Sequence, residues 1–99
     1  MPGKKEFVVV ATVKARPGKE AQLEKALRDV IAPTKAQKGC IGFELFRSVQ
    51  DAGSITALER WASKEDHEKH LQGDHVKRLM GSFEGVVNGE PTFLMMNPL

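Results

Sequence analysis

The feature that most constrains the fold is an apolar run at residues 7–13, with the sequence FVVVATV. Its density of β-branched residues favours a strand. Side chains alternate between the two faces of a strand, and here both faces carry apolar residues. One face holds Phe7, Val9, Ala11 and Val13, and the other holds Val8 and Val10. A sheet built around this strand must therefore be covered on both sides.

A helix is predicted after this strand. Residues 15–18 (ARPG) combine turn residues with a helix-start signal. From Lys19 onward, apolar side chains recur at the i, i+3, i+4, i+7 and i+8 spacing of a helix that buries one stripe. They are Leu23, Ala26, Leu27, Val30 and Ile31. Pro33 should stop or kink this helix, because proline lacks a backbone N–H and clashes with the preceding turn.

Two more strands are predicted in the middle of the chain. Residues 40–49 alternate in character, with one parity formed by Ile41, Phe43 and Leu45 and the other by Gly42, Glu44 and Phe46. Residues 50–53 (QDAG) are typical of a hairpin turn, and residues 55–61 return as the third strand. Since Phe43 and Phe46 differ in parity, the second strand also has large apolar side chains on both faces.

The second helical region is expected to begin after Ser63, which suits an N-cap with Asp66 as its capping-box partner. Gly73 and Asp74 interrupt the helical pattern. The spacing then resumes through Val76, Leu79, Met80 and Phe83. Asn88 and Gly89 should end this element, and residues 92–96 form a last short strand.

The resulting order, βαββαβ, predicts an α+β fold of the ferredoxin-like type, with a four-stranded antiparallel sheet and helices on one face. The length of 99 residues suits a single domain over residues 1–99. Helices on one side leave the other face of the sheet uncovered. A second copy of the chain, packed sheet against sheet, is the simplest cover, so we expect a homodimer.

Composition excludes several classes of function. A net charge of +2, with the basic residues spread along the chain and no RNA-type aromatic motif, argues against a nucleic-acid partner. Cys40 is the only cysteine, so an intrachain disulfide is impossible. Residues 1–6 carry no apolar leader core, and no apolar run approaches membrane-spanning length. We therefore expect a cytoplasmic protein without a membrane partner.

The candidate site lies in residues 59–75, which hold the only tryptophan and all three histidines of the chain. Glu59 and Trp61 are two residues apart, so they point to the same face of a strand. His67 and His70 are three apart and share one face of the helix that follows. A pocket between this strand and this helix is predicted.

Three segments give the chain a family resemblance. They are residues 13–20 (VKARPGKE), 38–48 (KGCIGFELFRS) and 59–65 (ERWASKE), followed by the spaced His70 and His75. In this order the chain resembles the antibiotic biosynthesis monooxygenase domain, a family of dimeric α/β barrels that includes quinol monooxygenase-like proteins. The resemblance covers nearly the whole chain, and the third segment is its most specific part.

The resemblance implies oxygenation of a quinol or phenol-like aromatic by dioxygen, without flavin, haem or metal. A deprotonated substrate of this kind is electron-rich enough to reduce dioxygen itself, so the protein supplies a base and an apolar pocket. In this interpretation His70, His75 and Glu59 are the catalytic residues, with His70 as the general base. The substrate-binding residues are Trp61, His67 and Phe43. Tyrosine is absent from the chain, which excludes a tyrosine-based mechanism.

Four of these site residues also have a structural alternative. Trp61 can be a core anchor rather than a stacking platform for substrate. Glu59 can pair with a nearby Lys or Arg, and His70 can make a structural hydrogen bond. His75 follows Asp74 at a predicted helix start, where it can be solvated.

Other functions are compatible with the same fold. A metal site is disfavoured, because the spacing of His67 and His70 matches no ligand motif and no second cysteine is present. Haem-binding relatives use an asparagine on the first strand, where this chain has Ala11. A protein that binds or isomerises a small metabolite without consuming oxygen stays open.

Overall fold

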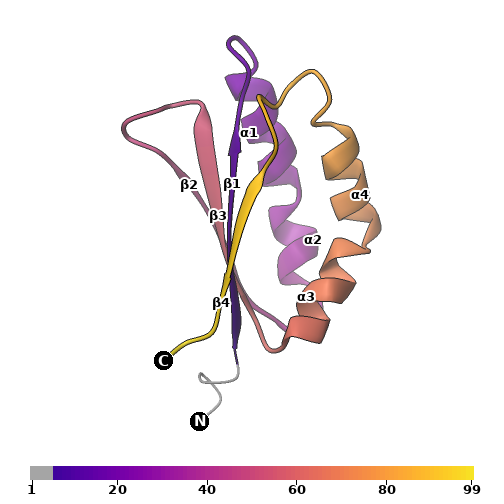
Figure 1. Ribbon diagram of the computed structural model, residues 1–99. Helices are drawn as coiled ribbons and strands as arrows, with labels where there is room; N and C mark the ends of the chain where they lie inside the picture. Colours follow the sequence, from indigo (N-terminus) through magenta and orange to yellow (C-terminus); the bar gives the residue numbers. More distant parts are fainter. Residues whose placement is uncertain (1–5) are drawn as a thin grey trace.

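The fold is described from a computed structural model, which covers residues 6–99. Residues 1–5, on which most of the expectation about a leader rests, lie outside the described residues. Eight elements follow in chain order: β1 (Phe7–Lys14), α1 (Glu20–Asp29), α2 (Ile31–Lys35), β2 (Cys40–Arg47), β3 (Ser54–Trp61), α3 (Lys64–Leu71), α4 (Asp74–Gly81) and β4 (Thr92–Met96). Figure 1 shows all of the helices on one side of the sheet. The predicted α+β ferredoxin-like order is confirmed, with each helical region divided in two.

The four strands form one antiparallel sheet in the order β2-β3-β1-β4. Strand β3 lies between β1 and β2, and its register places Glu59 beside Val9 on one side and Phe43 on the other. These three residues are buried against the helices. The centre of the helix-covered face therefore carries a carboxyl group in an apolar row.

A β-bulge changes the start of β2. The register shifts between Cys40 and Gly42, which leaves Ile41 as the extra residue of the bulge. Strand alternation predicted that Ile41 lies on the same strand face as Phe43, which is buried. That prediction is wrong, because Ile41 is 54% exposed. The strand also ends at Arg47, two residues earlier than predicted. There the hydroxyl of Ser48 accepts hydrogen bonds from two backbone N–H groups of the turn, and this turn ends the strand.

Pro33 breaks the first helical region as predicted, and the position of the break has a simple cause. Helix α1 ends at Asp29, Val30 separates the two helices, and α2 begins at Ile31. A proline ring clashes with the carbonyl four residues before it, and for Pro33 that residue is Asp29. The second helical region ends at Gly81 rather than near Asn88, and the hydroxyl of Ser82 donates to the carbonyl of Leu79 at 2.6 Å.

Helix α3 is fixed at its first turn. The hydroxyl of Ser63 accepts a hydrogen bond from the backbone N–H of Asp66 and donates one to its carboxylate, both at 3.1 Å, so the predicted N-cap is confirmed. Gly39 packs against the same carboxylate and its carbonyl accepts from Ala62 N at 2.7 Å. The loop before β2 and the start of α3 are thus joined, which sets where His70 lies.

Gly39 offers a test of this junction. Its φ is +86°, and a Cβ at this position lies only 2.3 Å from the Asp66 carboxyl group. Gly18 has nearly the same φ, +84°, but open space around it. Both alanine variants carry the backbone cost of positive φ, of about 1 kcal/mol, and only Gly39→Ala adds the clash.

We expect Gly39→Ala to lower the free energy of unfolding in urea by at least about 1 kcal/mol more than Gly18→Ala does. Equal losses in the two variants would show that the approach of Gly39 to Asp66 contributes nothing to stability.

Candidate functional site

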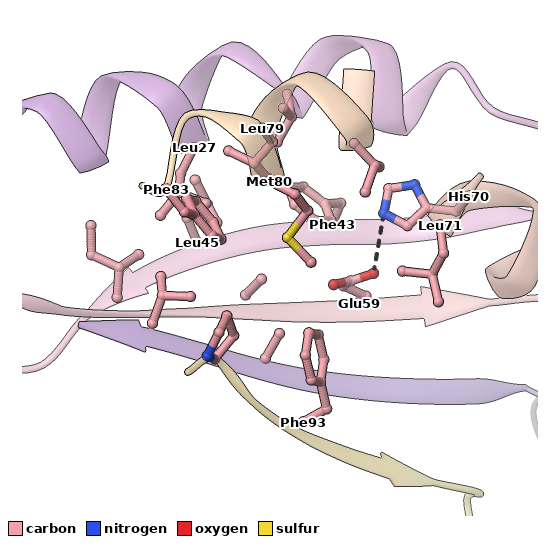
Figure 2. Close-up of a pocket in the computed structure, with 17 residues that line it drawn as sticks. Leu27, Phe43, Leu45, Glu59, His70, Leu71, Leu79, Met80, Phe83 and Phe93 are labelled. Atoms are coloured by element: carbon pink, nitrogen blue, oxygen red, sulfur yellow. Dashed lines mark ion pairs between the residues drawn. The ribbon is translucent and has the colours of Figure 1, made fainter. Parts of the chain in front are cut away.

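An apolar pocket lies between the sheet and the helices, as predicted, and Figure 2 shows its lining. Fifteen of its seventeen lining residues are apolar, and the two polar ones are Glu59 and His70. The two polar side chains face each other at one end of the pocket (Figure 2). The apolar lining residues are Ala11, Val13, Leu27, Val30, Phe43, Leu45, Ile55, Ala57, Leu71, Val76, Leu79, Met80, Phe83, Pro91 and Phe93.

Glu59 is a carboxyl group buried in an apolar wall. Its exposure is 6%, and the indole N–H of Trp61 donates to its Oε1 at 3.0 Å. Trp61 can reach it because the two residues share one strand face. Burial raises the pKa of Glu59 above its usual value, and the hydrogen bond from Trp61 opposes this only in part. The carboxyl group is therefore a stronger proton acceptor than an exposed one.

His70 faces Glu59 from α3. Its Nε2 lies 3.8 Å from Glu59 Oε1, and its Nδ1 lies 2.5 Å from Oε1 of Gln37. Its exposure is 6%. Burial, followed by the nearby His75 and His67, lowers the pKa of His70 from 6.5 to about 4. At neutral pH the imidazole is therefore uncharged and has a free lone pair, and the lowered pKa makes it a weaker base than an exposed imidazole.

Trp61 lies behind this pair rather than on the pocket wall. It is fully buried, and its ring lies 4.7 Å from that of His70 and 6.0 Å from that of His67. His67 is also buried, and its ring packs against Phe7 at 5.4 Å. Trp61 and His67 thus pack beside His70, and neither lines this pocket. His67 instead lines an adjoining hollow with Leu71, Met80 and Phe93.

The structure separates the six predicted site residues into two groups. Glu59, His70 and Phe43 line the pocket together, whereas Trp61, His67 and His75 do not. His75 lines a different hollow on the helical side, with Asp29, Arg78 and Ser82, although its ring is 5.5 Å from that of His70. The functional roles of all six remain predictions.

Several lining residues and Gln37 were missed by reasoning from the sequence. The sequence pattern placed Leu79, Met80 and Phe83 in one apolar helical stripe. That stripe was the signal that could have shown that the three side chains face a common space. Phe93 lay in the predicted last strand without an assigned face. Gln37 lies in the connection between α2 and β2, and no pattern in the sequence marks it.

In residues 6–99 no group of three or more His, Cys, Asp or Glu side chains has an arrangement that could hold a metal ion. Cys40 is half-buried, and burial, helped by the nearby Glu59, raises the pKa of its thiol. None of the helices in the described part of the chain is long and apolar enough to cross a membrane.

The sequence itself identifies the family. Residues 6–81 match the model of the antibiotic biosynthesis monooxygenase family. The chain belongs to this family. A relative from Mycobacterium tuberculosis, named "Putative monooxygenase Rv0793", is 31% identical over 67 residues, which span 68% of this chain and 65% of that protein.

Several solved structures have a fold similar to that of this chain. The crystal structure of PA3566 from Pseudomonas aeruginosa has a TM-score of 0.91 and 25% identity, and covers 98% of this chain and 97% of that one. A Caulobacter crescentus protein described as a "putative antibiotic biosynthesis monooxygenase" has a TM-score of 0.89 and 28% identity, with 98% and 92% covered. The fold of this family member is thus shared over its whole described length.

The lowered pKa of His70 predicts a pH dependence of stability. An unfolded histidine binds a proton near pH 6.5, whereas His70 in the folded chain binds one only near pH 4. Its contribution to stability is therefore complete above about pH 6.5 and is lost as the pH falls toward 4. The shift corresponds to about 3 kcal/mol. Glu59, with a raised pKa, changes stability in the opposite direction.

We expect the free energy of unfolding of the wild type to fall by up to about 3 kcal/mol more than that of His70→Gln between pH 7 and pH 4. Urea titrations at several pH values measure the free energy of unfolding of both proteins. Parallel curves of this free energy against pH would contradict the lowered pKa of His70.

Proposed function

We propose that the chain is a monooxygenase that oxygenates a quinol or phenol-like aromatic without flavin, haem or metal. The observation that carries the proposal is the pairing of a neutral His70 with Glu59 at one end of an otherwise apolar pocket. Membership in the antibiotic biosynthesis monooxygenase family supports the class of reaction. The apolar lining of the pocket, with two polar groups at one end, suits a small aromatic molecule that carries one or two hydroxyl groups.

The proposed first step is removal of a proton from a substrate hydroxyl. His70 Nε2 faces the pocket and accepts this proton, which makes the ring a cation 3.8 Å from Glu59. The Glu59 carboxylate then stabilises the imidazolium by charge attraction in a dry site. The aromatic anion that results transfers electrons to dioxygen, with one oxygen atom kept in the product and the other released as water. Both electrons and both hydrogens of that water come from the substrate, so no external reductant is consumed.

A second candidate is proton transfer without oxygen. Glu59 with a raised pKa and His70 with a lowered one form an acid–base pair that could also isomerise a small metabolite. An oxygen electrode distinguishes the two functions, because only a monooxygenase consumes oxygen in proportion to substrate. A haem function has less support, since the position expected for asparagine holds Ala11, an apolar part of the pocket wall.

The base assignment predicts the effect of removing His70. With a quinol that the wild type turns over, His70→Ala should lower kcat by about 10²- to 10⁴-fold, the usual range for loss of a general base. His75→Ala is the matched control, because His75 lies off the pocket, and it should have a much smaller effect. His67→Ala should also do less than His70→Ala. Oxygen uptake measures turnover, and circular dichroism confirms that each variant is folded.

Full activity in His70→Ala would reject His70 as the base. Absence of oxygen uptake by the wild type across a broad quinol and phenol panel would instead count against the monooxygenase function as a whole.

We also propose that a second copy of the chain covers the open face of the sheet. On that face Val10 lies between Leu58 of β3 and Leu94 of β4 in the strand register. Leu94 is 62% exposed, and Phe46 and Met96 are 51% and 41% exposed. A row of apolar side chains across three strands is more than a monomer normally leaves in water.

The dimer should bury more than about 1,000 Å² in total. Light scattering at micromolar concentration should give twice the chain mass, and Leu94→Lys should shift the protein toward the monomer. Val49→Lys is the control, because Val49 is fully exposed in the loop between β2 and β3. A wild type that stays monomeric would contradict this proposal.

A further inference from the structure

Gln37 is held close to the site by its backbone. Its N–H donates to the carbonyl of Thr34 at 3.0 Å, and its own carbonyl accepts from Cys40 N at 3.1 Å. Two residues later, Gly39 is packed against the first turn of α3. The side chain of Gln37 therefore extends from a fixed point toward a fixed helix, and it ends 2.5 Å from His70 Nδ1.

We infer that Gln37 is a positioning residue whose side-chain oxygen accepts the Nδ1–H of His70, so that Nε2 is left unprotonated toward Glu59 and the pocket. This inference rests on the proposed function, because it assigns which nitrogen of His70 takes the substrate proton. Nothing else in the described structure contacts Nδ1 by a hydrogen bond.

The distances around the ring favour this tautomer over the other. A neutral imidazole has a single N–H. If the hydrogen were on Nε2, its nearest partner would be Glu59 Oε1 at 3.8 Å, which is too far for a hydrogen bond. That oxygen already accepts from Trp61 at 3.0 Å. A buried donor would be left unsatisfied, whereas a hydrogen on Nδ1 is satisfied by Gln37.

A neutral amide and a carboxylate at this position would affect the charge of His70 differently. A carboxylate at Nδ1 would raise the pKa of His70 and bring the ring closer to being charged before substrate arrives. An amide oxygen fixes the tautomer without adding charge. When Nε2 gains the substrate proton, the Nδ1 hydrogen bond to Gln37 is kept and the new N–H faces the Glu59 carboxyl group. Gln37 therefore orients the His70 ring, and Glu59 stabilises the positive charge that the ring gains.

The tautomer of His70 can be measured directly, without turnover. Nitrogen-15 NMR of histidine-labelled protein should show His70 protonated at Nδ1 in the wild type. Gln37→Leu should remove this preference, giving a mixture or the Nε2–H form. Gln37→Glu should raise the pKa of His70 by about 1 to 3 pH units, the usual effect of an opposite charge nearby. Gln22→Leu and Gln22→Glu on the exposed side of α1 are the matched controls and should change neither property.

Kinetics adds a second measurement where a quinol is turned over. Gln37→Leu should lower kcat on the order of 10²-fold with little change in KM, since a misoriented base affects the reaction rather than binding. Gln37→Glu should move the acidic limb of the pH–rate profile upward, and Gln22 variants should leave it in place.

A wild-type His70 protonated at Nε2, or a tautomer and titration that are unchanged in Gln37→Leu, would overturn the inference. Those outcomes are distinct from failure of the proposed function, which shows itself as absent oxygen uptake in the wild type whatever the tautomer of His70.

Discussion

Burial of the Glu59 carboxyl group is the constraint on which the rest of the site depends. It lies at the centre of the sheet, between apolar neighbours on both adjoining strands. A carboxylate in such surroundings is strongly destabilised unless polar groups reach it. Trp61 supplies a hydrogen bond from the same strand and His70 supplies a polar ring from α3.

An apolar side chain of similar volume at position 59 would give a simpler core. Buried polar groups of this kind are often neutral or unfavourable for stability compared with well-packed apolar ones. Here the two buried groups also differ in the direction of their pKa shifts, because the pKa of Glu59 is raised and the pKa of His70 is lowered. Titratable groups with opposed shifts beside an apolar pocket are characteristic of acid–base sites. The arrangement therefore supports the proton transfer proposed for this pair.

Local chemistry made much of the fold predictable from the sequence. The break before Pro33 and the cap at Ser63 depend on residues within four positions of each other, so a short pattern contains them. The shared face of Glu59 and Trp61 likewise follows from strand alternation alone. The bulge at Ile41 does not, because it depends on how β2 registers against β3.

The arrangement of the site was less accessible, because it depends on packing between elements. His70 and His75 are five residues apart, but the break at Gly73 places them on separate helices, and only His70 reaches the pocket. Gln37 and His70 are 33 residues apart, and their contact requires the junction of Gly39 with α3. Trp61 was predicted on the correct face, yet its indole N–H is used by Glu59 and its ring is covered. These contacts depend on tertiary packing, which the local spacing of residues in the sequence does not predict.

Strand β4 connects the pocket with the open face of the sheet. Within residues 6–99 it is an edge strand of five residues that pairs with β1 alone. Phe93 points to the pocket and Leu94 to the opposite face, because neighbouring residues of a strand alternate. A short edge strand is weakly held by its ladder alone. A second copy packed on Leu94 would therefore also fix the wall that Phe93 forms, so that in the proposed dimer the shape of each pocket depends on the assembly that covers the other face.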